Sequence, residues 1–185
     1  MTDVAARATR APETAEAYIA RLLAALGSRD PFDVLGTTPR ELRRAIEGLD
    51  DADLSTREGP GLWSVRHVLQ HLADSELVGA FRIRMVLAHD RPALAGYDQE
   101  LWAERLHYDQ IDVDEVLADF ERLRLANLRL LRHATPADRE RVGLHSERGE
   151  ESIAQMILNY AGHDIVHLRQ IARIRRAIGA PNDSA

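Results

Sequence analysis

The sequence contains no cysteine among its 185 residues. This absence excludes disulfide bonds, thiolate metal ligands and a cysteine nucleophile, and it is consistent with a reducing compartment. Aromatic residues are also scarce, at 5% of the chain, whereas hydrophobic residues as a whole make up 45%. A chain of this length can bury a sizeable core, and we expect that core to consist mainly of leucine, alanine, isoleucine and valine.

Three further absences narrow the choice of function. Lysine is missing, so all 24 basic residues are arginines, and 30 acidic residues outnumber them to give a net charge of −6. An acidic chain with dispersed arginines argues against a nucleic-acid-binding surface. No apolar run is long enough to cross a bilayer, and residues 1–12 lack the apolar segment of a signal peptide. We therefore expect a cytoplasmic protein that binds neither nucleic acid nor membrane.

Helix patterns dominate residues 13–180, which we interpret as one helical domain between a flexible N-terminal arm (1–12) and a C-terminal tail (181–185). Apolar residues three and four apart predict the helices, and capping residues, glycine and proline predict their ends. Four long helices are predicted at 13–26, 64–89, 112–133 and 152–178, with shorter ones at 38–49 and 135–138. No segment alternates as a strand should, and we expect 143–149 to form a short hairpin or no regular structure.

Four long helices with mostly short connections predict an all-α four-helix bundle. The connection at 91–111 is long enough to run the length of a helix, so we expect one long crossover connection, with a single helical turn near 99–105. Connections of this length usually contribute to function rather than to packing.

Two pairs of histidines lie four residues apart, His67 with His71 and His163 with His167. Residues at this spacing lie on one face of a helix. Two imidazoles from one helix and a third from a facing helix can hold a metal ion and leave a coordination position open, as in catalytic sites. Such pairs also arise by chance, and the alternative is that the rings only make hydrogen bonds in half-buried positions.

Helical phase distinguishes the two members of the first pair. At about 100° per residue, His71 lies on the flank of the apolar stripe of its helix, whereas His67 lies nearer the polar face. We therefore favour His71 as a ligand and expect His67 to be solvated. His163 and His167 both flank the apolar stripe of the last helix on the side of Tyr160, which is the arrangement of a helix edge that lines a cavity.

Four segments together resemble the DinB/YfiT-like superfamily of metal-binding four-helix bundles: WSVRHVLQHLADS (63–75), FR (81–82), GYDQELWAE (96–104) and HDIVHL (163–168). The branch most similar to the chain contains metal-dependent hydrolases related to bacillithiol S-transferases. The resemblance implies an up-down-down-up bundle, a homodimer, and a nickel or zinc ion held by His71, His163 and His167. Close relatives often have further histidines where this chain has Gln70, Val166 and Gln170, so the surroundings of the metal are expected to differ.

From this resemblance we predict an enzyme that uses a three-histidine divalent metal site to activate water or a low-molecular-weight thiol. Water would give a hydrolase and a thiol would give an S-transferase, and an isomerase with a thiol cofactor is a further variant. Two other classes stay open. One is a metal- or ligand-binding sensor without turnover, and the other is a structural helical dimer whose histidines never bind metal.

Arg82, Tyr97, Trp102 and Tyr160 are candidate substrate contacts. Arg82 shares the helix flank of His71, so it is placed either to meet an anionic substrate group or to form an ordinary ion pair. The three aromatic side chains are expected either to line the pocket or to pack in the core. His145 follows in a polar segment from which it could reach the mouth of a pocket.

Overall fold

The computed structural model describes residues 13–179, so the predicted arm (1–12) and tail (181–185) lie outside the described residues. The described part is mostly helical, as predicted, and contains three short strands. The helices are α1 (Ala15–Leu26), α2 (Pro31–Ala45), α3 (Asp51–Ser55), α4 (Val65–Ala88), α5 (Gln99–Arg105), α6 (Val113–His133), α7 (Pro136–Arg139) and α8 (Ile153–Ala177), with a 3-10 turn η1 (Tyr108–Gln110). The strands are β1 (Ala93–Leu94), β2 (Val142–His145) and β3 (Gly149–Ser152).

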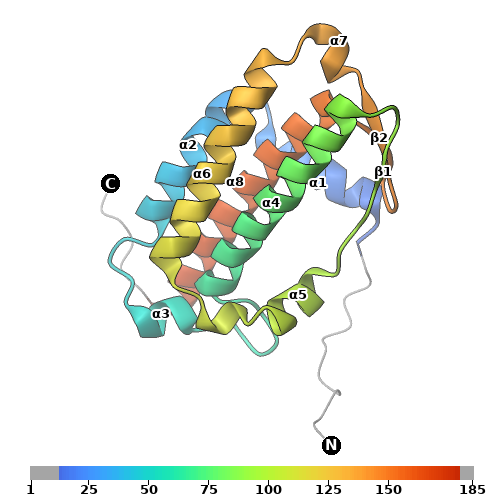
Figure 1. The fold of residues 1–185 in the computed structure, drawn as a ribbon. Helices are drawn as coiled ribbons and strands as arrows, with labels where there is room; N and C mark the ends of the chain where they lie inside the picture. The colour runs from blue at the N-terminus through green and yellow to red at the C-terminus, as the bar shows by residue number, and fades with distance from the viewer. Residues whose placement is uncertain (1–12, 180–185) are drawn as a thin grey trace, which may run out of the picture.

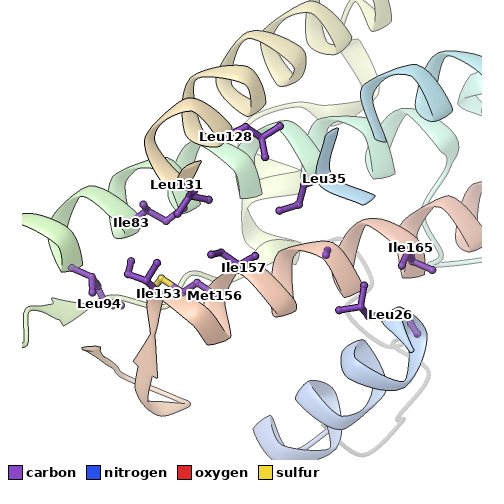
Figure 2. Close-up of a cluster of buried hydrophobic side chains, with 13 residues drawn as sticks. Leu26, Leu35, Ile83, Leu94, Leu128, Leu131, Ile153, Met156, Ile157 and Ile165 are labelled. Atoms are coloured by element: carbon purple, nitrogen blue, oxygen red, sulfur yellow. The ribbon is translucent and has the colours of Figure 1, made fainter. Parts of the chain in front are cut away.

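Helices α2, α4, α6 and α8 form the four-helix bundle (Figure 1). Both α4 and α2 pack against α6 and α8, which closes the ring. Two clusters of buried apolar side chains fill its interior. One cluster includes Ile83 and Ile157, whose side chains point toward each other between α4 and α8 in Figure 2. The other includes Leu72 and Ile171. The core is mainly aliphatic, as the composition predicts.

The start of α2 differs from the prediction. The sequence predicted a short helix from residue 38, with Pro39 at its first position, and counted α1 among the four long helices. Instead, a carboxylate oxygen of Asp30 accepts hydrogen bonds from the backbone N–H groups of Phe32 and Asp33, at 2.8 and 3.0 Å. Pro31 then takes the first helical position, which suits proline. As a result α2 is a bundle helix, and α1 packs against α8 from outside.

Pro39 therefore lies inside α2. Because proline has no N–H, it leaves the backbone carbonyl of Leu35 without its usual helical donor. The guanidinium of Arg124, which is buried on α6, donates to that carbonyl at 3.0 Å. The interior proline is thus compatible with the bundle because a side chain from a neighbouring helix replaces the missing hydrogen bond.

The connection between α4 and α6 runs back along the bundle through β1 and α5 (Figure 1). The helical turn predicted near 99–105 is α5. Strands β2 and β3 form an antiparallel hairpin in which Gly143 pairs with Glu151, and β1 pairs in parallel with β2. A three-stranded sheet was not predicted, because strands of two and four residues are too short to show alternation. No helix in the described part is long and apolar enough to cross a membrane.

Candidate metal centre

Three imidazole rings from two helices meet inside the bundle. His71 lies on α4, and His163 and His167 lie one turn apart on α8. Atom Nε2 of His163 lies 3.1 Å from Nε2 of His71 and 3.1 Å from Nε2 of His167. All three candidate ligand atoms lie within 4.8 Å of one another. The structure therefore brings together the three histidines that the sequence singled out, which we call the histidine cluster.

The rings of the histidine cluster are uncharged at neutral pH. Burial, reinforced by the neighbouring imidazoles, holds the pKa values of His71 and His163 well below the usual value for histidine. Burial also lowers the pKa of His167 to about 4. Each neutral ring has one nitrogen that carries a lone pair, so the cluster presents acceptors rather than positive charges.

Gln170 determines which nitrogen of His167 carries the proton. Its side-chain oxygen Oε1 lies 2.8 Å from Nδ1 of His167. An amide oxygen can only accept, so Nδ1 is protonated and Nε2 has its lone pair free to face the other two rings. Metal-ligating histidines usually donate their second N–H in this way. Atom Nδ1 of His71 is buried and, within residues 13–179, has no hydrogen-bond partner.

This set of donors fits a transition-metal ion. Zinc–nitrogen bonds of about 2.0–2.1 Å, at angles between 90° and tetrahedral, place ligand nitrogens about 2.8–3.4 Å apart. Two of the three separations, both 3.1 Å, fall in that range, and the third pair, His71 and His167, lies within 4.8 Å and would close slightly around an ion. Neutral imidazoles suit zinc, nickel, copper and iron better than magnesium or calcium. A proton on Nε2 of His163 would satisfy at most one neighbouring lone pair well, so the other would stay buried without a partner.

His67 lies one turn before His71 but is not part of the cluster. Arg57 lies 3.0 Å from its Nε2, and the hydroxyl of Ser64 lies 2.8 Å from its Nδ1. Because arginine only donates, Nε2 accepts from Arg57 and Nδ1–H donates to Ser64. The prediction that His67 is solvated is wrong, since the ring is 3% exposed. Arg57, which precedes α4 in a loop, and the nearby ring of Trp63 lie against it.

A pocket of about 420 Å³ adjoins the histidine cluster, and His71 and His163 form part of its wall. Three of the predicted substrate contacts, Arg82, Tyr97 and Tyr160, also line it. Trp102 is not among the lining residues, and its ring instead packs against Tyr97 with ring centres 4.4 Å apart.

Among the lining residues that sequence reasoning missed are Tyr18, Arg148, Glu151 and Asn159. The first lies on α1, whose contact with α8 was not predicted, and the next two lie on the β2–β3 hairpin, whose place beside the pocket was not predicted.

Two glycines allow the close packing around this pocket. A Cβ at Gly162 would lie 2.3 Å from the backbone oxygen of Leu22, so only glycine lets α1 approach α8 beside His163. A Cβ at Gly79 on α4 would lie 2.5 Å from the hydroxyl oxygen of Tyr160. The two glycines therefore position one wall of the pocket and one of its aromatic side chains.

A second group of buried polar side chains begins at Asp164, the residue after His163. The guanidinium of Arg124 contacts the Asp164 carboxylate at 2.5 and 3.0 Å and the Glu76 carboxylate at 2.9 Å. Asn127 donates to the other oxygen of Glu76 at 2.7 Å. Burial opposes the charge of Arg124, but the two carboxylates outweigh it and raise the pKa, so the guanidinium is charged. We call Arg124, Glu76, Asp164 and Asn127 the arginine cluster.

Comparisons with known proteins identify the family of the chain and agree with its fold. The sequence profile of the DinB superfamily matches residues 35–171. A protein of Oceanobacillus iheyensis is 34% identical over 136 residues, which cover 74% of this chain and 78% of that protein. A protein of Bacillus mycoides is 34% identical over 140 residues, which cover 76% and 80%. Both bear the name "Putative metal-dependent hydrolase".

A solved structure, that of YfiT from Bacillus subtilis, has the same fold. It matches with a TM-score of 0.76 and 25% identity, over 96% of this chain and 97% of that one. That protein is described as a probable metal-dependent hydrolase with an unusual four-helix bundle topology. The chain belongs to the DinB superfamily, as its motifs indicated.

Proposed function

We propose that the protein is a metal-dependent enzyme of the hydrolase or thiol S-transferase type. The observation that carries the proposal is the convergence of three neutral Nε2 atoms, from His71, His163 and His167, beside a pocket of about 420 Å³. Three protein ligands with open positions are typical of catalytic rather than structural metal sites. The names of the relatives support a metal-dependent hydrolase.

The proposed metal is nickel or zinc, held by Nε2 of the three histidines. When bound to neutral ligands, such an ion keeps its full positive charge and makes the deprotonated form of water or a thiol available near neutral pH. The chain contributes no sulfur nucleophile because it has no cysteine. In the transferase form of the proposal, the sulfur therefore comes from a low-molecular-weight thiol that enters the pocket.

Tyr97 and Tyr160 act in this proposal as hydrogen-bond donors rather than bases. Burial raises the pKa of Tyr97 to about 12, although a hydrogen bond with Ser75 opposes the shift. Burial also raises the pKa of Tyr160 above its usual value. Both phenols are therefore protonated at neutral pH and can orient polar groups of a substrate.

Turnover by metal-loaded protein tests the proposal. Nickel- and zinc-loaded wild type would be assayed with activated esters, for hydrolysis, and with thiol–electrophile pairs, for S-transfer, beside His163→Ala as the site-deficient control. We expect turnover of one class in the wild type and none above background in the variant. Full metal loading without turnover in either class would contradict the enzyme and favour a metal-dependent sensor.

We also propose the up-down-down-up topology with one long crossover. The cluster that includes Leu72 draws on the beginnings of α4 and α6, with Val65 and Val113, and on the ends of α2 and α8, with Leu42 and Ile174. Because the beginnings of α4 and α6 and the ends of α2 and α8 contribute to one cluster, they lie at the same end of the bundle. This supports a topology in which α4 and α6 are parallel to each other and antiparallel to α2 and α8. The crossover between α4 and α6 then returns the chain to the end where α4 began.

A homodimer in the cytoplasm is the remaining part of the proposal. Leu77 and Phe81 lie one turn apart on α4 and are 52% and 65% exposed. Covering exposed apolar side chains stabilises an interface, so this pair supports self-association. We expect light scattering to give twice the chain mass, and Phe81→Glu to give the monomer mass. A monomeric wild type at concentrations of about 0.1 mM would contradict the dimer.

A further inference from the structure

The β2–β3 hairpin packs against α4 beside the pocket. Burial alternates along β2, where Gly143 and His145 are buried and Leu144 is exposed. A Cβ at Gly143 would lie 2.8 Å from a methyl group of Val86 on α4, so this face of the strand is directed toward the helix. His145 is on the same face because residues two apart share a side of a strand.

Arg82 lies next to His145. Its guanidinium donates a hydrogen bond to the backbone oxygen of Ala95, and the preceding residue, Leu94, pairs with His145 in the sheet. Arg82 is 7% exposed and lines the pocket, as does Arg148, whereas His145 is buried and is not itself among the lining residues. The pocket wall therefore contains a buried guanidinium with further N–H groups beyond the one that donates to Ala95.

His145 presents a single N–H donor that has no acceptor. The backbone N–H of Glu147 donates to Nδ1 of His145 at 3.1 Å, so the proton of the neutral ring is on Nε2. Burial, together with Arg148 and Arg82, lowers the pKa of His145 to about 4, so the ring is neutral at pH 7. Atom Nε2 is buried and finds no hydrogen-bond partner among residues 13–179.

Arg148 has another buried N–H group that lacks an acceptor. One terminal nitrogen of Arg148 donates to Glu151 at 2.7 Å. Its Nε–H is buried and has no acceptor in the part of the chain that the structure describes. Buried donors without acceptors are costly and rare in folded proteins. Two of them, beside the guanidinium of Arg82, indicate that a negatively charged acceptor is supplied from outside.

The acidic residues near these donors do not supply the missing acceptors. Both oxygens of Glu151 are used, since one accepts from Arg148 at 2.7 Å and the other from Asn159 at 2.8 Å. Glu147 is exposed at the rim of the pocket, and Glu13 pairs with Arg21. Among the charged lining residues that are buried or half-buried, Arg82 and Arg148 contribute two positive charges and Glu151 one negative charge, whereas the exposed Glu13 and Glu147 are screened by solvent. One positive charge is left, which matches a singly charged carboxylate better than a doubly charged phosphate.

We propose that Arg82, Arg148 and His145 bind a carboxylate group of the substrate at the hairpin wall of the pocket. The carboxylate oxygens accept from Nε2–H of His145, from Nε–H of Arg148 and from Arg82. The role of this site in turnover rests on the proposed function, because His71 and His163 line the same pocket. Carboxylate binding itself does not require the metal.

Benzoate is a suitable probe, with benzamide as its uncharged counterpart of the same shape. Binding would be measured by nuclear magnetic resonance of the histidine rings in the full chain, both metal-loaded and chelator-treated. The His145 resonance is identified by its loss in His145→Gln. We expect benzoate to shift that resonance in both forms and to bind about tenfold or more tightly than benzamide. Binding in the metal-loaded form alone would place the carboxylate on the metal and overturn the proposal, as would phosphate binding more tightly than benzoate.

Three variants test the donors of Arg148 and His145, and a fourth is the control. Arg148→Gln and His145→Phe should each weaken benzoate binding about tenfold. His145→Gln, whose amide keeps an N–H near the position of Nε2, should stay within about threefold. Arg91→Gln removes the same charge from the outer side of the sheet, where Arg91 pairs with Glu150, and should leave affinity unchanged.

Equal benzoate affinity in wild type and Arg148→Gln would overturn the carboxylate site. Metal content should be the same in all four variants, because none of them changes the histidine cluster. If the wild type bound no metal but kept its affinity for benzoate, the proposed function would fail and the carboxylate site would stand. The two proposals can therefore fail separately.

Discussion

Two clusters of buried polar side chains meet α8 at adjacent residues, the histidine cluster at His163 and the arginine cluster at Asp164. In the arginine cluster, a charged guanidinium lies between two carboxylates at 2.5 to 3.0 Å. In the histidine cluster, three neutral rings face one another, and within the described residues no carboxylate belongs to the group. Both clusters are largely buried, with only His167 half-buried, but only the arginine cluster contains both signs of charge.

The contrast separates a role in folding from a role in binding. Buried charges that neutralise one another fix how the helices pack, and removing one partner leaves the others uncompensated. Buried acceptors that converge without a cation contribute little to packing, and they indicate that a cation comes from outside. We therefore expect substitutions in the arginine cluster to change stability, and substitutions in the histidine cluster to change metal binding.

The largest expected effect is that of Arg124→Met. Without the guanidinium, Glu76 and Asp164 are buried and unpaired, and the carbonyl of Leu35 loses its donor. We expect the free energy of unfolding to fall by about 3–5 kcal/mol, measured by urea denaturation. The matched control is Arg122→Met on the same helix, where the side chain is 78% exposed and the change should be below about 0.5 kcal/mol. Equal losses in both variants would remove the distinction between the clusters.

In the histidine cluster, His167→Ala should change metal binding rather than stability. Metal affinity should fall at least about a hundredfold, because one of three ligands is lost, while the helix content of the metal-free protein stays nearly unchanged. His67→Ala should keep the metal and lose about 1 kcal/mol of stability, since His67 bonds to Arg57 and Ser64. Isothermal titration with zinc or nickel measures the metal affinity of each variant, and urea denaturation measures the stability of His67→Ala. Retained affinity in His167→Ala would mean that the ligands are misassigned.

His145 is intermediate between the two clusters. It is buried, its Nδ1 accepts a hydrogen bond, and its Nε2–H has no acceptor among the described residues. Its pKa is about 4 in the folded protein, against an ordinary value of about 6.5. The unfolded chain therefore binds more protons between these values, so this histidine lowers stability as pH falls from about 6.5 to 4. His145→Gln should remove up to about 3 kcal/mol of that acid destabilisation in chelator-treated protein. Identical pH profiles of urea denaturation would contradict the depressed pKa.

The smallest expected effect belongs to Gln170, which accepts from His167 at 2.8 Å. Gln170→Leu leaves Nδ1–H of His167 without an acceptor, and metal affinity should fall about tenfold. Gln170→Glu keeps the acceptor and should retain wild-type affinity or exceed it. If both substitutions changed affinity equally, Gln170 would have no part in orienting the ring.

The sequence predicted the helices whose ends have local signals. Asp112 and Ser152 accept hydrogen bonds from the backbone three residues later, which marks the starts of α6 and α8. The start of α2 was missed because Thr38 and Pro39 imitate a helix start, and the feature that allows Pro39 inside the helix is Arg124, 85 residues later in the chain. Such long-range compensation cannot be read from a local pattern.

The same limit applies to the candidate site. Spacing and helical phase singled out His71, His163 and His167. Both are local properties of a single helix, so they can be read from the sequence. Burial of His67 was missed because Arg57 and Trp63 lie against it from a loop whose path has no sequence signature. The sequence placed His145 near the mouth of a pocket but gave Arg148 no role, and it identified neither as a donor, since their N–H groups become unpaired only when the sheet packs on α4.

Elemental analysis of metal content tests the central claim most directly. Wild type and His71→Ala, both without affinity tags, would be dialysed together against a limiting mixture of nickel, zinc and manganese. The three-histidine site predicts about one transition-metal ion per chain in the wild type and none in the variant. Absence of metal from the wild type, or equal metal in the two proteins, would contradict a metal centre at His71, His163 and His167.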